Sequence, residues 1–258
     1  LEQMSEFGRT RYHDITARQV DRSVFDSKLA EYNTKMGVDV RLGVGVLPDS
    51  PTNGPSIIID KKNGHKIRTT DGWIGCKWLI DASGRTSPLA RSLKLVDREP
   101  RLQTFSYWAR FKNINLIDEL GSDDWRARVN YTPRYNSTNH FQYRGYWMWH
   151  IPLTEDIVSI GVDVDQQIHP LKIKDSNELI SFLREHKSMD QILGDCPEVL
   201  DFKAYTYLPR CAKNTYSTDR WFLTGMSGTF VDVMGSNTCR MYGESNRLVG
   251  EMIKTDHN

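Results

Sequence analysis

The sequence predicts a mixed α/β (α+β) fold in which a mainly antiparallel β-sheet domain is inserted into a domain of strands and helices. Three observations predict it. Residues 1–103 contain both strand and helix patterns. Residues 104–208 contain mostly short strand patterns. Residues 209–258 again combine a strand, a turn of small residues and a helix. A chain that leaves a nucleotide-type domain, builds a sheet and then comes back gives this order.

Composition and charge exclude several functional classes. The 258 residues include 34 Lys and Arg against 33 Asp and Glu, without a long basic block, so wholesale binding to nucleic acid is poorly supported. No window approaches 18 consecutive apolar residues and the start lacks the shape of a signal peptide, which predicts a cytoplasmic protein without a membrane span. The four widely spaced cysteines are expected to be reduced thiols, not a disulfide frame or a metal site.

Helical spacing of apolar residues predicts a first helix from about Ser23 to Lys35, after an irregular start over residues 1–19. Asp21 or Ser23 can cap this helix, and Gly37 ends it.

A meander of strands with glycine turns is predicted next, followed by a short helix from Pro88 to Leu95. The predicted strands are Val38–Val46, Ser56–Asp60 and Trp73–Ile80.

The middle of the chain reads as a second sheet. Its predicted strands are Phe105–Phe111, Ala127–Tyr131, Asn139–Arg144, Tyr146–Ile151 and Val158–Val164. Two helices follow, Ser176–Glu185 with Ser176 as its N-cap and Met189–Leu193.

The last part predicts a buried strand at Arg220–Leu223, a turn of small residues from Gly225, and a helix over Met241–Ile253. Such a turn lets a ligand approach the backbone, and the helix N-terminus presents free N–H groups. A tight connection without a ligand is an equally consistent interpretation.

Two motifs could carry chemistry. Asp81-Ala82-Ser83-Gly84-Arg85 follows an apolar strand, where it can form a sharp turn with polar groups, although a purely structural turn explains it as well. In residues 145–153, alternation places Trp147 and Trp149 on one face as a stiff aromatic wall and His150 on the other. A sheet packing face is the alternative interpretation, and the run lacks metal-ligand spacing.

Together these segments resemble the flavin-dependent halogenases, often called tryptophan halogenases, which are relatives of the p-hydroxybenzoate hydroxylase type of FAD monooxygenase. The resemblance covers nearly the whole chain. Its most specific part is WxWxIP at 147–152, and it also rests on DASGR (81–85), VSIGVDVD (158–165), RWFLTGMSGTFVD (220–232) and VDRSVFDSKL (20–29).

The resemblance implies a flavoprotein oxidoreductase that uses FAD and a halide ion. Reduced flavin would react with oxygen to a hydroperoxide, and halide would convert it into hypohalous acid for an aromatic or other electron-rich substrate. The substrate could be carrier-bound, and an active enzyme would need a separate flavin reductase. The implied cofactor-binding residues are Arg22, Asp81, Gly84, Arg85, Gly225, Ser227, Gly228 and Asp232. The implied substrate pocket comprises Trp147, Trp149, Ile151 and Pro152, and the implied halide residues are Ser236 and Thr238.

The sequence departs from the family pattern in several places. The 258 residues contain no GxGxxG, so the first βαβ unit with its phosphate cradle is missing, and the family's catalytic lysine has no counterpart. Met226 stands where the family has an acidic residue, and Val233 where it has proline. Asn237 and Thr238 replace the small or Pro/Gly residues expected in the halide loop.

Three interpretations therefore stay open: a truncated or degenerate halogenase, a non-catalytic scaffold or binding protein derived from this fold, or an FAD-dependent hydroxylase, which WxWxIP disfavours. We expect Asp81–Arg85 and Gly225–Asp232 to meet in space. We expect Trp147 and Trp149 to line a cavity beside Ser236, and the chain by itself to bind FAD weakly or not at all.

Overall fold

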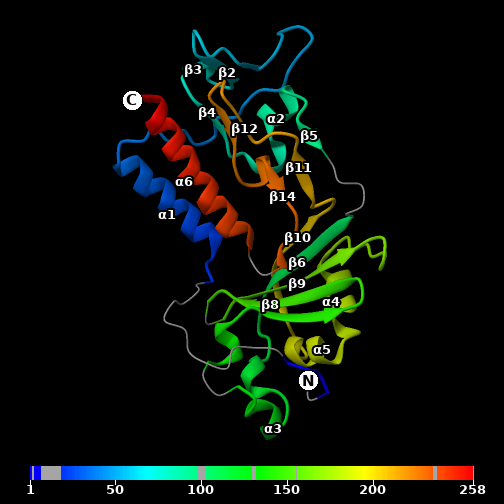
Figure 1. Cartoon of the computed structure of the whole chain (residues 1–258). Coiled ribbons are helices and arrows are strands. Elements are labelled where there is room, and N and C mark those ends of the chain that lie inside the picture. The colour runs from blue at the N-terminus through cyan, green and yellow to red at the C-terminus, as the bar shows by residue number, and fades with distance from the viewer. Residues whose placement is uncertain are drawn as a thin grey trace. The chain divides into compact units, whose positions relative to one another are not determined.

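The computed structural model in Figure 1 describes residues 1, 3–6, 19–97, 103–129, 132–154, 156–234 and 237–257. The chain divides into two compact units, each built from two stretches of sequence. The first unit comprises Leu1–Val38 and Thr104–Thr206, and the second comprises Asp39–Gln103 and Tyr207–Asn258. Residues 1–38 thus group with the inserted sheet.

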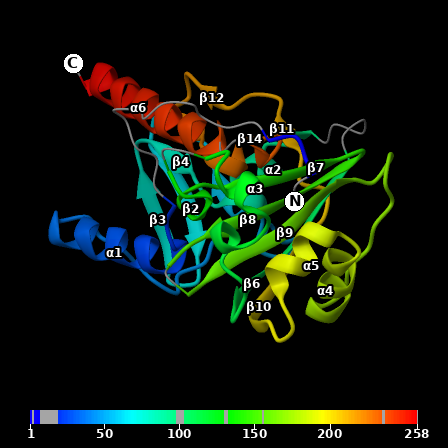
Figure 2. The same cartoon turned by 90° about the horizontal axis from the view of Figure 1, so that it is seen from below.

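The first unit is built on a five-stranded antiparallel sheet with the strand order β10-β6-β9-β8-β7. Its strands are β6 (Thr104–Lys112), β7 (Asn139–Tyr143), β8 (Tyr146–Pro152), β9 (Val158–Asp165) and β10 (Glu198–Tyr205). Helices α4 (Ser176–Arg184) and α5 (Lys187–Leu193) lie beside it, as Figure 2 shows. Apolar side chains of both helices and of alternate strand residues form one buried core.

Two details of the first unit differ from the sequence prediction. Ala127–Tyr131 is not a strand, because Ser122 caps the short helix α3 (Asp123–Arg126) and Ala127 ends it; Asn130 and Tyr131 lie outside the described residues. The N-cap of α4 is Asp175, whose carboxylate accepts hydrogen bonds from the backbone N–H groups of Asn177 and Glu178, so Ser176 is its first helical residue.

Helix α1 (Arg22–Lys35) forms as predicted and is capped by Asp21, whose carboxylate accepts the backbone N–H of Ser23. No residue of α1 is buried. Its apolar residues are therefore exposed: Val24, Phe25, Leu29 and Tyr32.

His150 of β8 is buried on the core face of the sheet, with only 1% of its surface exposed. Its Nδ1 atom has no hydrogen-bond partner among the described residues. Because burial disfavours the charged imidazolium, the pKa of His150 falls from 6.5 to about 4, and the negative charge of Asp118 only partly opposes this shift.

We predict that His150 makes the protein less stable in mild acid. Between pH 6.5 and pH 4 the unfolded chain binds this proton and the folded protein does not, so the free energy of unfolding falls as the pH falls. The loss is about 3 kcal/mol for a shift of this size. Urea denaturation across this pH range should show a smaller pH dependence in His150→Phe than in the native sequence. An identical pH dependence in both proteins would contradict the assignment.

The described residues of the second unit form three small sheets. The meander β1-β2-β3 comprises Ile57–Ile58, His65–Thr69 and Gly72–Cys76. The sheet β14-β11-β5 comprises Thr229–Phe230, Arg210–Ala212 and Val96–Asp97, and the sheet β12-β13-β4 comprises Tyr216–Ser217, Trp221–Leu223 and Leu79–Asp81. Helices α2 (Pro88–Ser92) and α6 (Asn237–His257) complete the unit, and residues of α2, β1, β4 and β13 share its buried core.

Two strand predictions in this unit need correction. Val38–Val46 is not a strand: only Val46 forms an isolated bridge, and two glycines, Gly43 and Gly45, interrupt the segment. The predicted strand Trp73–Ile80 is divided between β3 and β4, which belong to different sheets.

The structure also bears on cysteines, metals and membranes. All four cysteines are free. Within the described residues, no group of three or more His, Cys, Asp or Glu side chains is arranged to hold a metal ion. None of the helices in the described part of the chain has both the length and the apolar character that a membrane crossing requires.

Candidate functional site

The two predicted turns of the second unit meet at the ends of two neighbouring parallel strands. Strand β13 pairs with β4 so that Leu223 lies opposite Asp81. The backbone N–H of Thr224 donates to the carbonyl of Asp81 at 2.9 Å, which continues the pairing to the last residue before each turn. Because the carboxyl ends of parallel strands share one edge, Asp81–Arg85 and the turn from Gly225 lie together, as predicted.

The carboxylate of Asp81 organises both turns from a buried position, with 5% of the residue exposed. Its Oδ1 atom accepts the backbone N–H of Ser83 at 2.9 Å and the hydroxyls of Ser83 and Ser227 at 2.6 and 3.0 Å. Its Oδ2 atom accepts the backbone N–H of Leu89, in the first turn of α2, at 3.0 Å. Asp81 therefore positions the backbone of these turns.

Ser227, in the turn after β13, connects that turn to the turn after β4 and is fully buried. Its hydroxyl oxygen accepts the backbone N–H of Gly84 at 2.9 Å while it donates to Asp81. Its own carbonyl accepts the hydroxyl of the buried Ser87 at 3.0 Å. Sequence reasoning missed Ser87, whose φ of +41° at the start of α2 has no signature in the sequence.

Gly84 and Gly225 supply the backbone conformations that the two turns require. Their φ angles are +69° and +63°, in the left-handed region where side chains are disfavoured. A Cβ atom added to Gly84 would meet no atom within 4 Å, so open space lies next to the first turn. This is where a ligand can approach the backbone.

The other residues predicted to bind the cofactor differ from one another in their contacts. The carbonyl of Arg85 accepts a hydrogen bond from Arg210 at 2.7 Å. Position 228 requires glycine for packing, because a Cβ atom there would lie 2.9 Å from the carbonyl oxygen of Leu223.

Asp232 accepts the backbone N–H of Met234 at 2.6 Å. Arg22, in the first unit, pairs with Asp26 at 2.9 Å on the exposed surface of α1.

Of the two predicted halide residues, Thr238 lies in the first turn of α6. Thr238 donates its hydroxyl to the carbonyl of Asp232 at 3.1 Å. Ser236 lies outside the described residues, so the predicted cavity beside it stays a prediction.

The first unit carries the predicted aromatic wall on the sheet face opposite α4 and α5. Trp147 and Trp149 point to the same side, with ring centroids 5.5 Å apart, and Met148 and His150 point to the core. Both indoles are buried, with 8% and 7% of their surface exposed. We call this group of rings the aromatic face. It consists of Trp108, His140, Trp147, Trp149 and Tyr205, in contacts with centroid distances of 5.1–6.4 Å.

Small and polar residues that sequence reasoning missed hold the aromatic face in place. Gly161 lies opposite both Trp108 and Trp149 on the neighbouring strands. The Trp149 indole N–H donates to the hydroxyl of Ser159 at 3.2 Å. Asp163, 2% exposed, accepts the hydroxyl of Ser106 and lies opposite Trp147. Strand alternation could have placed these residues on this face once the strand pairing was known.

The side chains of the second unit allow a test of whether an FAD-type cofactor fits. Asp81 and Ser227 are engaged with their own turns, so their contribution to a cofactor is to fix the backbone. The open side of Gly84 allows the close approach that a flavin or its ribityl chain needs. Met226, half-buried, offers no strong hydrogen-bonding group. The turns thus fit the flavin end of such a cofactor, and no GxGxxG in this sequence is available for its pyrophosphate.

Comparison with curated proteins gives halogenases. No model of a protein family matches the chain. It is 27% identical over 185 residues to the flavin-dependent halogenase chlA of Dictyostelium discoideum, covering 69% of this chain and 30% of the relative. It is 26% identical over 246 residues to the 1H-pyrrole-2-carbonyl-(peptidyl-carrier protein) chlorinase of Pseudomonas fluorescens, covering 93% of this chain and 51% of the relative. These matches confirm the resemblance to the flavin-dependent halogenases, of which the chain spans about a third to a half.

The fold is also that of solved halogenases. The crystal structure of halogenase PltM matches with a TM-score of 0.77 and 18% identity, over 92% of this chain and 47% of that one. CmlS, a flavin-dependent halogenase, matches with a TM-score of 0.63 over 88% of this chain. The predicted fold class, an FAD-binding-type domain with an inserted antiparallel sheet, is confirmed.

Proposed function

We propose that this chain forms the cofactor-facing turns and the substrate sheet of a flavin-dependent halogenase. The observation that carries the proposal is the joining of the turns after β4 and β13 by Asp81 and Ser227. Four hydrogen bonds to one buried carboxylate fix a backbone surface with open space at Gly84. A fixed backbone with room for a ligand is what a flavin requires, and the sequence relatives are halogenases that depend on flavin.

In this proposal the chain's residues bind and orient the reactants. The backbone of residues 83–85 and 225–228 contacts the flavin, and Asp81 and Ser227 keep these groups in place. When bound, reduced FAD together with molecular oxygen would supply the two-electron oxidation of halide to hypohalous acid, with water as the other product. Ser236 and Thr238 are the proposed halide residues.

The proposed substrate is an aromatic or other electron-rich small molecule. The aromatic face supports this, because indole rings offer a stiff apolar wall on which a flat ring can stack. One relative chlorinates a carrier-bound pyrrole, and halogenase PltM has been solved with phloroglucinol and FAD. Either a free or a carrier-bound aromatic ring fits the proposal, with a separate reductase supplying reduced flavin.

We expect Trp147→Ala and Trp149→Ala to lower substrate turnover at least tenfold, about 1.4 kcal/mol in the barrier, without changing FAD affinity. The assay supplies saturating FAD, a flavin reductase, bromide or chloride, and phloroglucinol as the probe, with products detected by mass spectrometry. Trp73→Ala, which removes a half-exposed indole from β3, is the control for an indole outside the aromatic face and should have no effect. Because Trp147 and Trp149 are buried, circular dichroism of each variant checks that it stays folded. An equal loss of FAD binding in the two variants would make these tryptophans structural.

A second candidate is a non-catalytic scaffold that keeps the halogenase fold. Two observations favour it. Met226 stands in place of an acidic residue, and both oxygens of the Asp81 carboxylate accept hydrogen bonds from within the chain. FAD binding separates the two candidates, because a scaffold that has lost the cofactor leaves the amide signals of both turns unchanged at any FAD concentration, whereas a part of a halogenase does not.

A further inference from the structure

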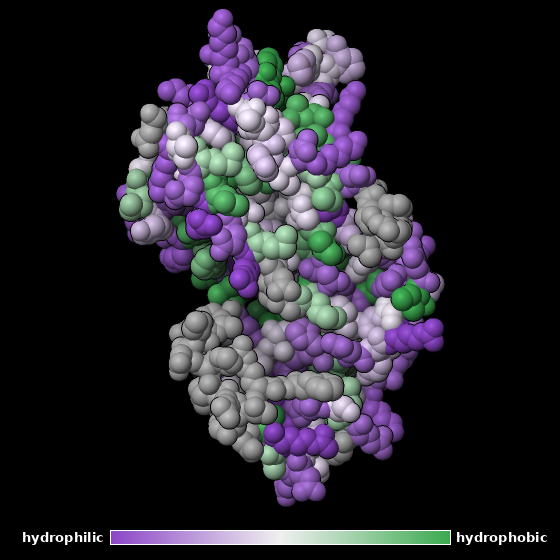
Figure 3. Space-filling model, viewed as in Figure 1, coloured by the Kyte–Doolittle hydropathy of each residue, from purple (hydrophilic) through white to green (hydrophobic). Residues whose placement is uncertain are grey.

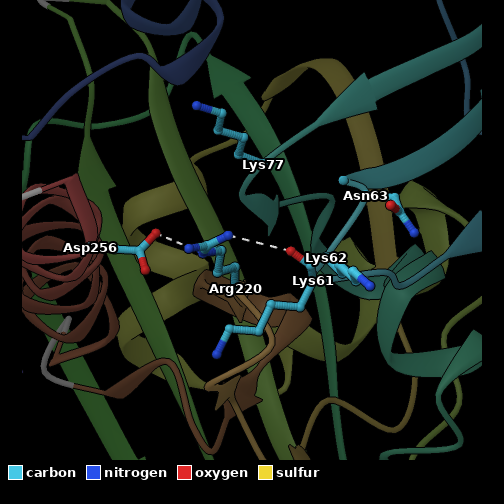
Figure 4. A pocket seen from close by; sticks show the side chains of 7 residues that line it. Lys61, Lys62, Asn63, Lys77, Arg220 and Asp256 are labelled. Atoms are coloured by element: carbon cyan, nitrogen blue, oxygen red, sulfur yellow. Dashed lines mark hydrogen bonds and ion pairs between the residues drawn. The ribbon is translucent and has the colours of Figure 1, made fainter.

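A basic hollow lies in the second unit, away from the residues of the proposed flavin turns. Its volume is about 240 Å³. Its lining, shown in Figure 4, comprises Lys61, Lys62, Asn63, Gly64, Lys77, Arg220 and Asp256. A second hollow of about 400 Å³ shares Asn63, Gly64 and Lys77 with it and adds Lys66. In Figure 3, hydrophilic side chains gather over β2 and β3, the strands next to these hollows.

Arg220 is held in one position at the hollow. Its φ of +64° is uncommon for a residue with a side chain. Its carbonyl accepts the backbone N–H of Leu79 at 3.0 Å and lies 3.2 Å from Nε2 of the buried His65. Because Nδ1 of His65 accepts the N–H of Asp60, Nε2 carries the proton and donates to Arg220. The backbone of Arg220 is thereby fixed from two sides.

The guanidinium of Arg220 is ordered as well. Its Nε lies 2.7 Å from Oδ2 of Asp256, and its Nη1 donates to the carbonyl of Lys61 at 3.4 Å. The same Asp256 oxygen accepts the indole N–H of Trp78 at 3.0 Å. Figure 4 shows Arg220 between Asp256 and the Lys61 backbone. An ordered guanidinium loses little entropy when it binds an anion.

The positive charge of the hollow is only partly balanced. The residues that line it include four cationic side chains and one carboxylate, and that carboxylate already contacts Arg220 and Trp78. In the described part of the chain, Lys61, Lys62 and Lys77 form no ion pair within 4.0 Å. The nearby Asp60 accepts hydrogen bonds from the backbone N–H and the side-chain amide of Asn63 and from the backbone N–H of Lys62. These bonds lower its pKa and engage its carboxylate in the turn.

We propose that this hollow binds a phosphate group, either as inorganic phosphate or as the end of a phosphate monoester. The Arg220 guanidinium keeps N–H donors on its Nη atoms beyond those directed at Asp256 and at the Lys61 carbonyl, and lysine ammonium groups add charge without demanding one geometry. The site goes beyond the proposed halogenase function and shares no residue with it.

The test is titration of the full chain with sodium phosphate at about 20 mM ionic strength, where screening is weak. The reporters are the amide signals of Asn63, Gly64 and Lys77 and the indole signal of Trp78 in nitrogen–proton NMR spectra. We expect these signals to shift together and to saturate with a dissociation constant on the order of 1 mM. The double variant Lys61→Gln/Lys77→Gln should raise this constant about tenfold.

Lys213→Gln, which removes one exposed lysine of the same unit outside the hollow, is the control and should leave the constant unchanged. Glycerol phosphate distinguishes the two ligands. If glycerol phosphate binds at least tenfold more tightly than inorganic phosphate, the result supports a phosphate monoester. If the two bind equally, the result supports the free phosphate ion. The proposal is overturned if chloride at equal ionic strength gives the same shifts, or if Lys213→Gln weakens binding as much as the double variant. Neither result would bear on FAD or halide.

Discussion

Gly161→Ala should be among the most destabilising single substitutions in the first unit, lowering its free energy of unfolding by about 3 kcal/mol or more. The added Cβ atom would lie 2.4 Å from Cζ2 of Trp149, 2.5 Å from Cβ of Trp108 and 2.6 Å from the backbone carbonyl of Tyr107. Two of these three atoms cannot move without shifting β6, and β6 has a neighbouring strand on each side. The aromatic face and the sheet would therefore both be disturbed.

The measurement is urea denaturation followed by tryptophan fluorescence. Gly75→Ala is the matched control, because Gly75 also lies within a strand, β3, and an added Cβ atom there would approach no atom closer than 3.9 Å. We expect the control to change stability by less than about 1 kcal/mol. A loss below 1 kcal/mol in Gly161→Ala would show that the tryptophans do not need this glycine.

Asp81→Asn should have a comparable effect on the second unit, about 3 kcal/mol. The substitution keeps the shape of the side chain but replaces the charge and turns one acceptor into an N–H donor. If the amide nitrogen takes the Oδ2 position it meets the backbone N–H of Leu89, and if it takes the Oδ1 position it meets that of Ser83. A buried donor is left unsatisfied in either case.

Asp71→Asn, an exposed carboxylate in the turn between β2 and β3, is the control and should be within about 0.5 kcal/mol of the native stability. Ser227→Ala tests the same network from the other turn. Since Ser227 and Asp81 are hydrogen-bonded to each other, the double variant should lose less stability than the two single losses added together. Additive losses would mean that the two turns are not coupled.

Much of this structure could be predicted from residue patterns. Alternation over residues 146–151 correctly placed Trp147 and Trp149 on one face, and the small residues after two apolar strands predicted the turns that meet at Asp81 and Ser227. These signals are local, since they depend on strand period and on the backbone freedom of glycine.

The remaining features depend on contacts between distant residues. Gly161 appears in the sequence as an ordinary glycine within a strand, and its importance comes from tryptophans on two other strands. Val38–Val46 has the alternation of a strand but gains only one bridge, because it lacks a neighbour to pair with along its length. The basic hollow likewise joins Lys61 to Arg220 and Asp256 across the second unit.

Titration of the full chain with FAD, followed residue by residue in NMR spectra, tests the central claim most directly. We predict that amide signals of residues 83–85 and 225–228 shift together, with a dissociation constant weaker than about 10 μM, roughly −7 kcal/mol, because the sequence offers no glycine-rich cradle for the pyrophosphate. Binding tighter than that would contradict the expected weakness and show that other residues replace the cradle. If FAD at about 1 mM leaves the signals of both turns unchanged, these turns do not face a flavin, and the halogenase proposal for this chain fails.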